Sequence, residues 1–294
     1  MKRFIGTIIA IIAALIMVNL VLMFVHWVTL EKTAEEFLEP TPIDIDLLPT
    51  SPKSHSKPYR YPSAKVAIVI DDLGVKTPQY LILMDIPFKL NLAIIPGLKN
   101  SKSLVKELAL MDRYELLLHM PMEPFPHRGD QESQGPSRIK TYPFYIDRHS
   151  KASSISLVLD EAMDQLNGWG FIKGLNNHMG SYVTSSPNMM VPIIDWTRSH
   201  QLFFLDSLTS RTTVAYEMAR RQHIPAYHNE MFLDGIDEPD VIRERLRKAV
   251  ARSRSEGQVV VIGHITRKYT LPVLKEMMPQ FADHGVSFVW LSEL

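Results

Sequence analysis

The sequence predicts an α/β fold in which a parallel sheet curls into a closed or nearly closed barrel. Short apolar runs rich in β-branched residues recur along the chain, as expected for buried parallel strands. Apolar residues at helical spacing lie between these runs. About seven strand–helix repeats fall within the last ~230 residues, which is more than a doubly wound open sheet usually contains.

The predicted strands are, in chain order, Val66–Ile70, Leu90–Ile95, Glu115–His119, Phe171–Leu175, Leu202–Leu205, Pro225–Tyr227, Val259–Ile262 and Val286–Leu291. The predicted helices are Ser101–Asp112, Ser153–Leu166, Met189–Ser199, Val214–Gln222, Pro239–Glu256 and Leu271–His284. The segment Pro121–Asp147 lacks periodicity, and a long excursion from a strand end is typical of loops that line functional sites.

An apolar segment precedes this domain. Phe4–Trp27 contains 24 residues without Asp, Glu, Lys or Arg, and ~20 such residues suffice for a helix to cross a bilayer. Lys2 and Arg3 before it predict a cytoplasmic N-terminus, with the rest of the chain on the extracytoplasmic (periplasmic) side of the cytoplasmic membrane. The alternative is a cleaved signal peptide and a secreted protein, although signal peptides usually have a shorter apolar region of about 7–15 residues.

Residues 31–62 carry six prolines among polar residues, which is typical of an extended, semi-rigid tether. The predicted organisation is therefore a cytoplasmic tip and transmembrane signal-anchor over residues 1–30, a Pro-rich linker over residues 31–62 and a barrel domain over residues 63–294.

The composition excludes several kinds of site. Lys+Arg and Asp+Glu number 32 each, and zero net charge argues against nucleic acid as a partner because phosphate binding needs a basic face. The chain has no cysteine, so a metal would be bound by His, Asp or Glu. The sequence also lacks the phosphate-binding loops, the serine-hydrolase elbow and the His-Glu-x-x-His motif. The kind of catalysis that the composition still allows is attack by a water that a divalent ion activates.

Acids and imidazoles follow the predicted strands where the strands end, at Asp71, Asp72, His119, His178, Asp206, His228 and His264. The carboxyl ends of barrel strands share one rim, so we expect these side chains to meet in one cleft. The adjacent carboxylates of Asp71 and Asp72 repel each other, which favours a bound cation or a shared proton over the alternative of a helix cap.

Imidazoles supply the other candidate groups. His119 and His178 are candidate metal ligands, and the alternatives are a core histidine with satisfied hydrogen bonds and an Asx turn. A carboxylate beside an imidazole raises its pKa and makes a useful general acid, which suggests Asp206 as the partner of His264. Glu123 is interpreted as a surface carboxylate, and for His228 and Asp234 structural and functional roles stay open.

Taken together, five motifs resemble the divergent polysaccharide deacetylase family, a branch of the NodB-type carbohydrate esterases. The likeness covers nearly all of Lys65–Leu294. It rests on Ile-Asp-Asp-Leu-Gly at 70–74, Leu-Leu-His-Met-Pro-Met-Glu-Pro at 117–124, Asn-Asn-His-Met-Gly-Ser at 176–181, Phe-Leu-Asp-Ser at 204–207 and Ile-Gly-His at 262–264. The resemblance implies a deformed (β/α)7-type barrel and the metal-dependent removal of N- or O-acetyl groups from a sugar polymer.

The resemblance also implies roles for single residues. The second Asp of the family's pair binds metal and the first is the base, which carries over to Asp72 and Asp71, and the general acid carries over to His264. The family's His-x-x-x-His ligand pair is here His119-x-x-x-Glu123, and its Arg-x-Pro-Tyr loop is missing. We infer that His178 replaces the lost ligand.

The expected function is that of a membrane-anchored hydrolase with a divalent ion, Zn²⁺, at Asp72, His119 and His178. The expected partner is an acetylated polysaccharide or a peptidoglycan-type glycan of the cell envelope. The alternative is a catalytically inactive barrel that binds a glycan or a partner protein there. A phosphoesterase with the same Asp/His set is a third interpretation, although the sequence shows no basic cluster for phosphate.

Overall fold

The computed structural model describes residues 64–126 and 142–294. All of these residues lie within one structural unit, Tyr59–Leu294. The predicted membrane segment, Phe4–Trp27, and the tether over residues 31–62 lie outside the described ranges. Among the residues that are described, none of the helices is both long enough and apolar enough to cross a bilayer.

Strands and helices alternate along most of the described chain. The strands are β1 (Ala64–Leu73), β2 (Leu90–Ile94), β3 (Tyr114–Met122), β4 (Ile172–Met179), β5 (Phe203–Asp206), β6 (Ala226–His228), β7 (Met231–Phe232), β8 (Gln258–His264) and β9 (Val286–Phe288). The helices are α2 (Pro78–Met84), α3 (Ser101–Leu108), α4 (Ala152–Leu166), α5 (Pro187–Ser199), α6 (Ala215–Arg221), α7 (Pro239–Glu256) and α8 (Thr270–Asp283), with short 3-10 turns at Val183–Ser185 and Leu291–Glu293.

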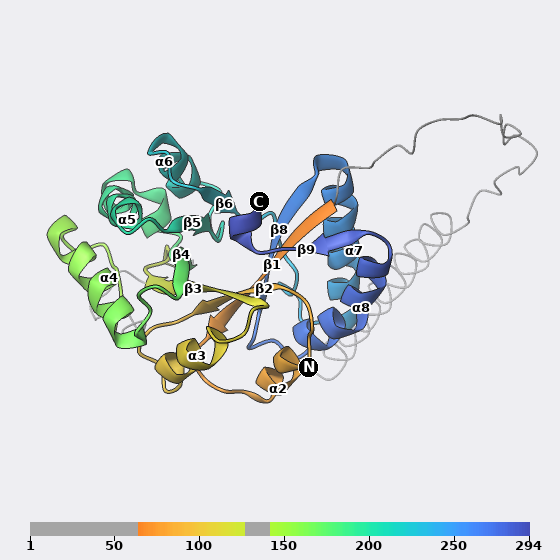
Figure 1. Ribbon diagram of the computed structural model, residues 1–294. Coiled ribbons are helices and arrows are strands. Elements are labelled where there is room, and N and C mark those ends of the chain that lie inside the picture. The colour runs from red at the N-terminus through yellow and green to blue at the C-terminus, as the bar shows by residue number, and fades with distance from the viewer. Residues whose placement is uncertain (1–63, 127–141) are drawn as a thin grey trace, which may run out of the picture. The chain divides into compact units, whose positions relative to one another are not determined.

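All strands pair in parallel in one sheet of order β6-β5-β4-β3-β2-β1-β8-β7, and β9 adds to the start of β1. The sheet is strongly curved and the helices lie on its outer side (Figure 1). The edge strands β6 and β7 are joined by a short segment of two residues. Strand β6 pairs with β5 at one edge of the sheet, and β7 pairs with β8 at the other. This curled parallel sheet agrees with the predicted (β/α) barrel.

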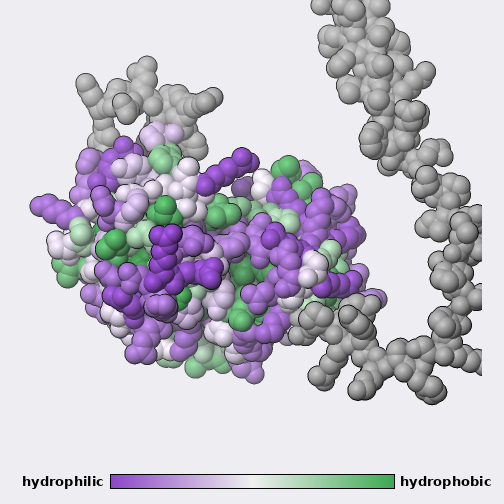
Figure 2. Space-filling model, turned by 90° about the horizontal axis from the view of Figure 1, so that it is seen from above, coloured by the Kyte–Doolittle hydropathy of each residue, from purple (hydrophilic) through white to green (hydrophobic). Residues whose placement is uncertain are grey.

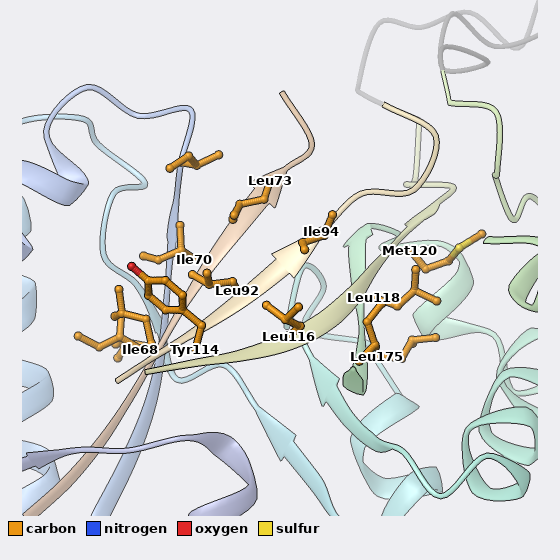
Figure 3. Close-up of a cluster of buried hydrophobic side chains, with 14 of the residues drawn as sticks. Ile68, Ile70, Leu73, Leu92, Ile94, Tyr114, Leu116, Leu118, Met120 and Leu175 are labelled. Atoms are coloured by element: carbon orange, nitrogen blue, oxygen red, sulfur yellow. The ribbon is translucent and has the colours of Figure 1, made fainter. Parts of the chain in front are cut away.

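Alternate residues of each strand face two separate cores. Ile68 and Ile70 of β1 point outward with Leu92, Leu116 and Leu118 and pack under the helices (Figure 3). The residues between them form an inner core: Ala67, Val69, Ala93, Leu117, Phe203, Leu205, Val260 and Ile262. The inner core fills the middle of the barrel, which leaves its two ends as places for a site.

The C-terminal segment closes one end of the barrel. Val289 and Leu291 belong to the inner core. The buried Asn91 side chain donates to the Val289 carbonyl and accepts from the Leu291 N–H, and the hydroxyl of Ser292 bonds to Glu115. These contacts cover the end where the strands begin. Apolar groups on the face shown in Figure 2 are small and interspersed with hydrophilic residues.

The eight predicted strands correspond to eight of the observed ones, with shifted ends. The prediction missed β7 and α2. Strand β7 has two residues, too few to show any periodicity, and α2 contains the exposed Leu81, which obscures its apolar face.

Candidate metal centre

Four strands bring the predicted polar residues to the open end of the barrel. Asp71 pairs in register with His264 across β1 and β8. Across β3 and β4, His119 pairs with Asn176. Because parallel neighbours end at the same rim, residues up to 193 positions apart in sequence lie side by side here.

A bulge at the end of β1 lets two adjacent carboxylates serve the same site. Successive residues of a regular strand face opposite sides of the sheet. Between Ile70 and Leu73, however, β1 advances by three residues while β2 advances by two. Asp72 adopts a left-handed backbone conformation, with φ of 69°. The extra residue turns the Asp72 side chain toward the rim that Asp71 already faces.

Three potential ligand atoms meet at this rim. Asp72 Oδ1 lies 3.0 Å from His178 Nδ1 and 3.3 Å from His119 Nε2, and the two nitrogens lie 3.2 Å apart. Tetrahedral zinc with Zn–N distances of ~2.0–2.1 Å separates its ligand atoms by roughly 3.3 Å. The three distances therefore match the edges of a zinc coordination tetrahedron.

The electrostatics of Asp72 support the same interpretation. Its Oδ1 is buried and has no aligned hydrogen-bond donor within the described ranges, although two imidazole nitrogens lie nearby. Burial alone would raise the pKa of Asp72, but the imidazoles of His119 and His178 hold that pKa far below its usual range. A charged, buried oxygen without a donor fits a cation between these residues.

A buried amide fixes His119. His119 Nδ1 lies 2.9 Å from Asn176 Oδ1, and Asn176 Nδ2 donates to Asp71 Oδ1 at 3.0 Å and to Ser207 Oγ at 3.2 Å. Since the amide nitrogen is used by two acceptors, its oxygen accepts from His119 Nδ1. In the neutral imidazole that binds a metal, Nε2 of His119 then carries the lone pair that faces Asp72.

Asp71 is suited to hold a proton. The carboxyl is buried, and burial raises its pKa above the usual value even though the charges of His119 and His264 oppose the change. Its Oδ2 lies 3.6 Å from His119 Nε2, beside the three candidate ligand atoms. Asp71 and Asp72 thus differ strongly in pKa, the arrangement that separates a base from a metal ligand.

His264 is held by Asp234 and not by Asp206. Its Nδ1 lies 2.8 Å from Asp234 Oδ1, and its backbone N–H donates to Asp234 Oδ2 at 2.6 Å. The ring stacks on Phe232, with the planes 19° apart. Burial alone would lower the pKa of His264, but the hydrogen bond and charge of Asp234, together with Asp71 and Asp72, raise it to about 9.

The prediction that Asp206 orients His264 is therefore wrong. Inner-core residues precede Asp206 on β5, so alternation turns its side chain outward and the next residue, Ser207, inward. Asp206 accepts instead from the Leu208 N–H, the Thr213 hydroxyl and the Tyr216 N–H, which fixes the turn after β5.

Glu123 and His228, the other candidates from the sequence, do not join the three ligand atoms. Glu123 accepts from Arg148 Nε at 2.7 Å and from the Arg148 N–H at 2.6 Å, so it forms an ion pair instead of joining the ligand set. The ring of His228 packs edge-on against Tyr216. Within the described residues, Asp72, His119 and His178 form the one group of three acids or imidazoles close enough to share an ion.

Comparison with known proteins agrees with this geometry. The sequence model of the divergent polysaccharide deacetylase family matches residues 68–294. The chain belongs to this family. That assignment confirms the resemblance read from the motifs and supports a deacetylase-like fold around the Asp/His cluster.

Several relatives share most of its length. The chain is 27% identical to an uncharacterized protein of Haemophilus influenzae over 248 residues, which is 80% of each chain. It is also 27% identical to the uncharacterized protein YibQ of Escherichia coli over 216 residues, 74% of this chain and 63% of that one. The crystal structure of an uncharacterized Agrobacterium tumefaciens protein matches with a TM-score of 0.68 at 18% identity, over 82% of this chain and 91% of that chain, and so shares the fold.

Sequence reasoning missed two residues of this deacetylase-family site. The roles of Asn176 and Tyr142 depend on side-chain contacts across strands and loops. Asn176 is the first residue of the motif at 176–181, which is a usable signal, but the motif does not show that its amide holds His119. Tyr142, whose hydroxyl lies 2.9 Å from His178 Nε2, lies within the segment without periodicity and gives no such signal.

Proposed function

We propose that this protein is a metal-dependent deacetylase that removes N- or O-linked acetyl groups from a polysaccharide of the cell envelope. The observation that carries the proposal is the meeting of Asp72, His119 and His178 beside a protonatable Asp71 and a protonated His264. The family assignment supports a carbohydrate as substrate.

The donor set fits a borderline-soft divalent ion such as Zn²⁺, with two imidazole nitrogens and one carboxylate oxygen from the protein. Such an ion would polarise the acetyl carbonyl and lower the pKa of a bound water. Asn176 and Tyr142 hold the outer nitrogens of the two imidazoles, so both rings present their other nitrogen to the site.

Two groups of the chain move protons in this proposal. Asp71, next to the ligand atoms, accepts a proton from the attacking water at its carboxylate. His264, held at Nδ1 by Asp234, donates a proton from Nε2 to the leaving amine or alcohol. The pKa of about 9 keeps this imidazole protonated at neutral pH, as a general acid requires.

We propose that the catalytic domain acts outside the cytoplasmic membrane. The apolar segment Phe4–Trp27 would be a single-pass anchor, and residues 31–62 a tether. Peptidoglycan-type glycans are substrates within reach of such an anchored domain. Protease digestion of intact spheroplasts tests this location: cleavage of the domain is expected, and full protection would refute it.

Acetate release tests the activity. Full-length protein in detergent micelles would be incubated with acetylated chitooligosaccharides, peptidoglycan fragments and O-acetylated glycans. We expect release that stops with chelator, returns with Zn²⁺ and is lost in Asp72→Asn. If no metal supports release from any of these substrates while glycan binding persists, the protein is the inactive glycan-binding barrel of the alternative hypothesis.

A further inference from the structure

The two imidazoles of the candidate metal centre are held in different ways. His119 is buried on β3 and its partner, Asn176, is a neighbouring strand residue. His178 is partly exposed near the end of β4, and the group at its outer nitrogen is the phenol of Tyr142. The rings of Tyr142 and His178 meet edge to face, with centroids 5.1 Å apart.

The phenol lies opposite the ligand atoms. Tyr142 contacts Nε2 of His178, while Nδ1 of the same ring faces Asp72 Oδ1 and His119 Nε2. A flip of the imidazole would exchange the two nitrogens and break both sets of contacts. The His178 side chain is 15% exposed and that of His119 is 2% exposed, so packing encloses the His178 ring less completely. An outer hydrogen-bond partner of this kind usually fixes the orientation of a metal-ligating histidine.

A short segment before α4 places Tyr142. Its Ile146 is fully buried, pairs with Met122 at the end of β3, and donates its N–H to the Pro121 carbonyl. Two residues later, Arg148 binds Glu123 through both its backbone N–H and its guanidinium. We name this Glu123–Arg148 pair the clasp. Glu123 is the fourth residue after His119, so the clasp ties the Tyr142 segment to the strand that carries a ligand.

We propose that Tyr142 is a positioning residue of the metal centre: its phenol keeps Nδ1 of His178 directed at Asp72 and His119, and the clasp keeps the phenol in place. This inference rests on the proposed metal-dependent function for its consequence. The contact itself is a property of the chain, so the contact and its consequence can be tested separately.

The first measurement needs no metal. Full-length protein labelled with ¹⁵N-histidine is placed in detergent micelles, and the His178 ring signals are identified by their loss in His178→Asn. Tyr142→Phe, which removes only the hydroxyl, is expected to shift the Nε2 signal of His178. Tyr145→Phe is the matched control, since the buried Tyr145 hydroxyl has no partner in the described part of the chain. Unchanged His178 signals in Tyr142→Phe would overturn the proposal.

The second measurement is Zn²⁺ affinity, determined by competition with a chromophoric chelator. Loss of an outer partner typically weakens metal binding about 10- to 100-fold, and we expect this for Tyr142→Phe but not for Tyr145→Phe. Equal affinity in Tyr142→Phe and wild type overturns the positioning role. If wild-type protein binds no Zn²⁺ while Tyr142→Phe still shifts the Nε2 signal of His178, the proposed function is refuted and the Tyr142 contact is supported.

A double-mutant cycle tests the clasp. Arg148→Met is expected to weaken Zn²⁺ binding through the displaced phenol, so it should add little in a Tyr142→Phe background. Fully additive losses would show that Arg148 acts independently of Tyr142, which refutes that part of the proposal. Thermal unfolding of each variant in the presence of chelator separates loss of metal binding from loss of folding.

Discussion

The substitution Asp234→Asn should weaken the general-acid role that we propose for His264. In the wild-type protein the pKa of His264 is raised from 6.5 to about 9. The closest cause of that rise is Asp234, which lies 2.8 Å from Nδ1. Asparagine keeps the shape but removes the charge, while burial of the ring continues to lower its pKa. We therefore expect the pKa of His264 to fall toward its ordinary value of 6.5, with Asp71 and Asp72 still opposing the effect of burial.

The magnitude follows from the two pKa values. At pH 7.5, roughly 97% of His264 is protonated with a pKa of about 9, against roughly 10% with a pKa near 6.5. Loss of the protonated form alone should thus lower deacetylation about tenfold at this pH. The assay is an NMR titration of the His264 Cε1–H signal, run alongside the pH dependence of acetate release.

The raised pKa of His264 should also make the stability of the wild-type protein depend on pH. A histidine whose folded-state pKa is raised stabilises the fold below its unfolded pKa, and the contribution is lost as the pH rises through the folded value. For His264 the window is pH 6.5 to about 9, and the gap corresponds to roughly 3 kcal/mol as an upper figure. Urea unfolding should show this loss in wild type and not in Asp234→Asn.

Asp206→Asn is the matched control. Asp206 is the last residue of β5 at the same rim, but its carboxylate bonds to the turn that follows β5. The substitution should leave the pKa of His264 near 9. The reasoning fails if Asp234→Asn keeps that pKa near 9, or if Asp206→Asn lowers it as much as Asp234→Asn does.

Three further predictions concern the ligands and their supports. His119→Ala and His178→Ala should each lower Zn²⁺ affinity by more than about 100-fold, because each removes a proposed direct ligand instead of an outer partner. The metal content of the purified variants, measured by atomic emission, should fall accordingly, and unchanged metal content removes that residue from the ligand set. Asn176→Leu removes the amide that contacts His119 Nδ1 and Asp71, so Zn²⁺ affinity should fall about 10- to 100-fold and the free energy of unfolding by about 1–3 kcal/mol. Chelator competition measures the affinity and urea unfolding measures the stability. Wild-type values in both would contradict the role of Asn176 between His119 and Asp71. Gly180→Ala places a Cβ 2.8 Å from Met122 at φ of 83°, so unfolding free energy should drop by about 1 kcal/mol or more; a variant as stable as wild type would show that this strand end can relax.

The strand ends could be predicted from the sequence because buried parallel strands are continuous apolar runs. Such a run ends visibly at Asp71, at His119 and at His264. Topology then places these ends at one rim without any knowledge of side-chain contacts. The three proposed ligands, taken from three separate strands, do meet within one ligand sphere.

The features of the candidate site that the sequence did not predict depend on local geometry, which a residue pattern does not encode. Strict alternation would place Asp72 on the side opposite Asp71, and only the bulge in β1 turns it to the rim. The partner of His264 was assigned to the wrong acid because Asp234 follows a strand of two residues, which leaves no periodic signal. Tyr142 lies within the long segment that lacks periodicity, so nothing in its neighbourhood marks it.

The left-handed backbone at position 72 restricts how this centre can evolve. Among residues with a side chain, Asp and Asn enter that conformation most readily, while others face a cost of roughly 1–2 kcal/mol. Glu could bind a cation but would meet both that cost and a longer reach. Lineages that abandon the chemistry should therefore pass through Asn or Gly at this position. A set of aligned homologues with Glu here, and the other two proposed ligands retained, would contradict that constraint.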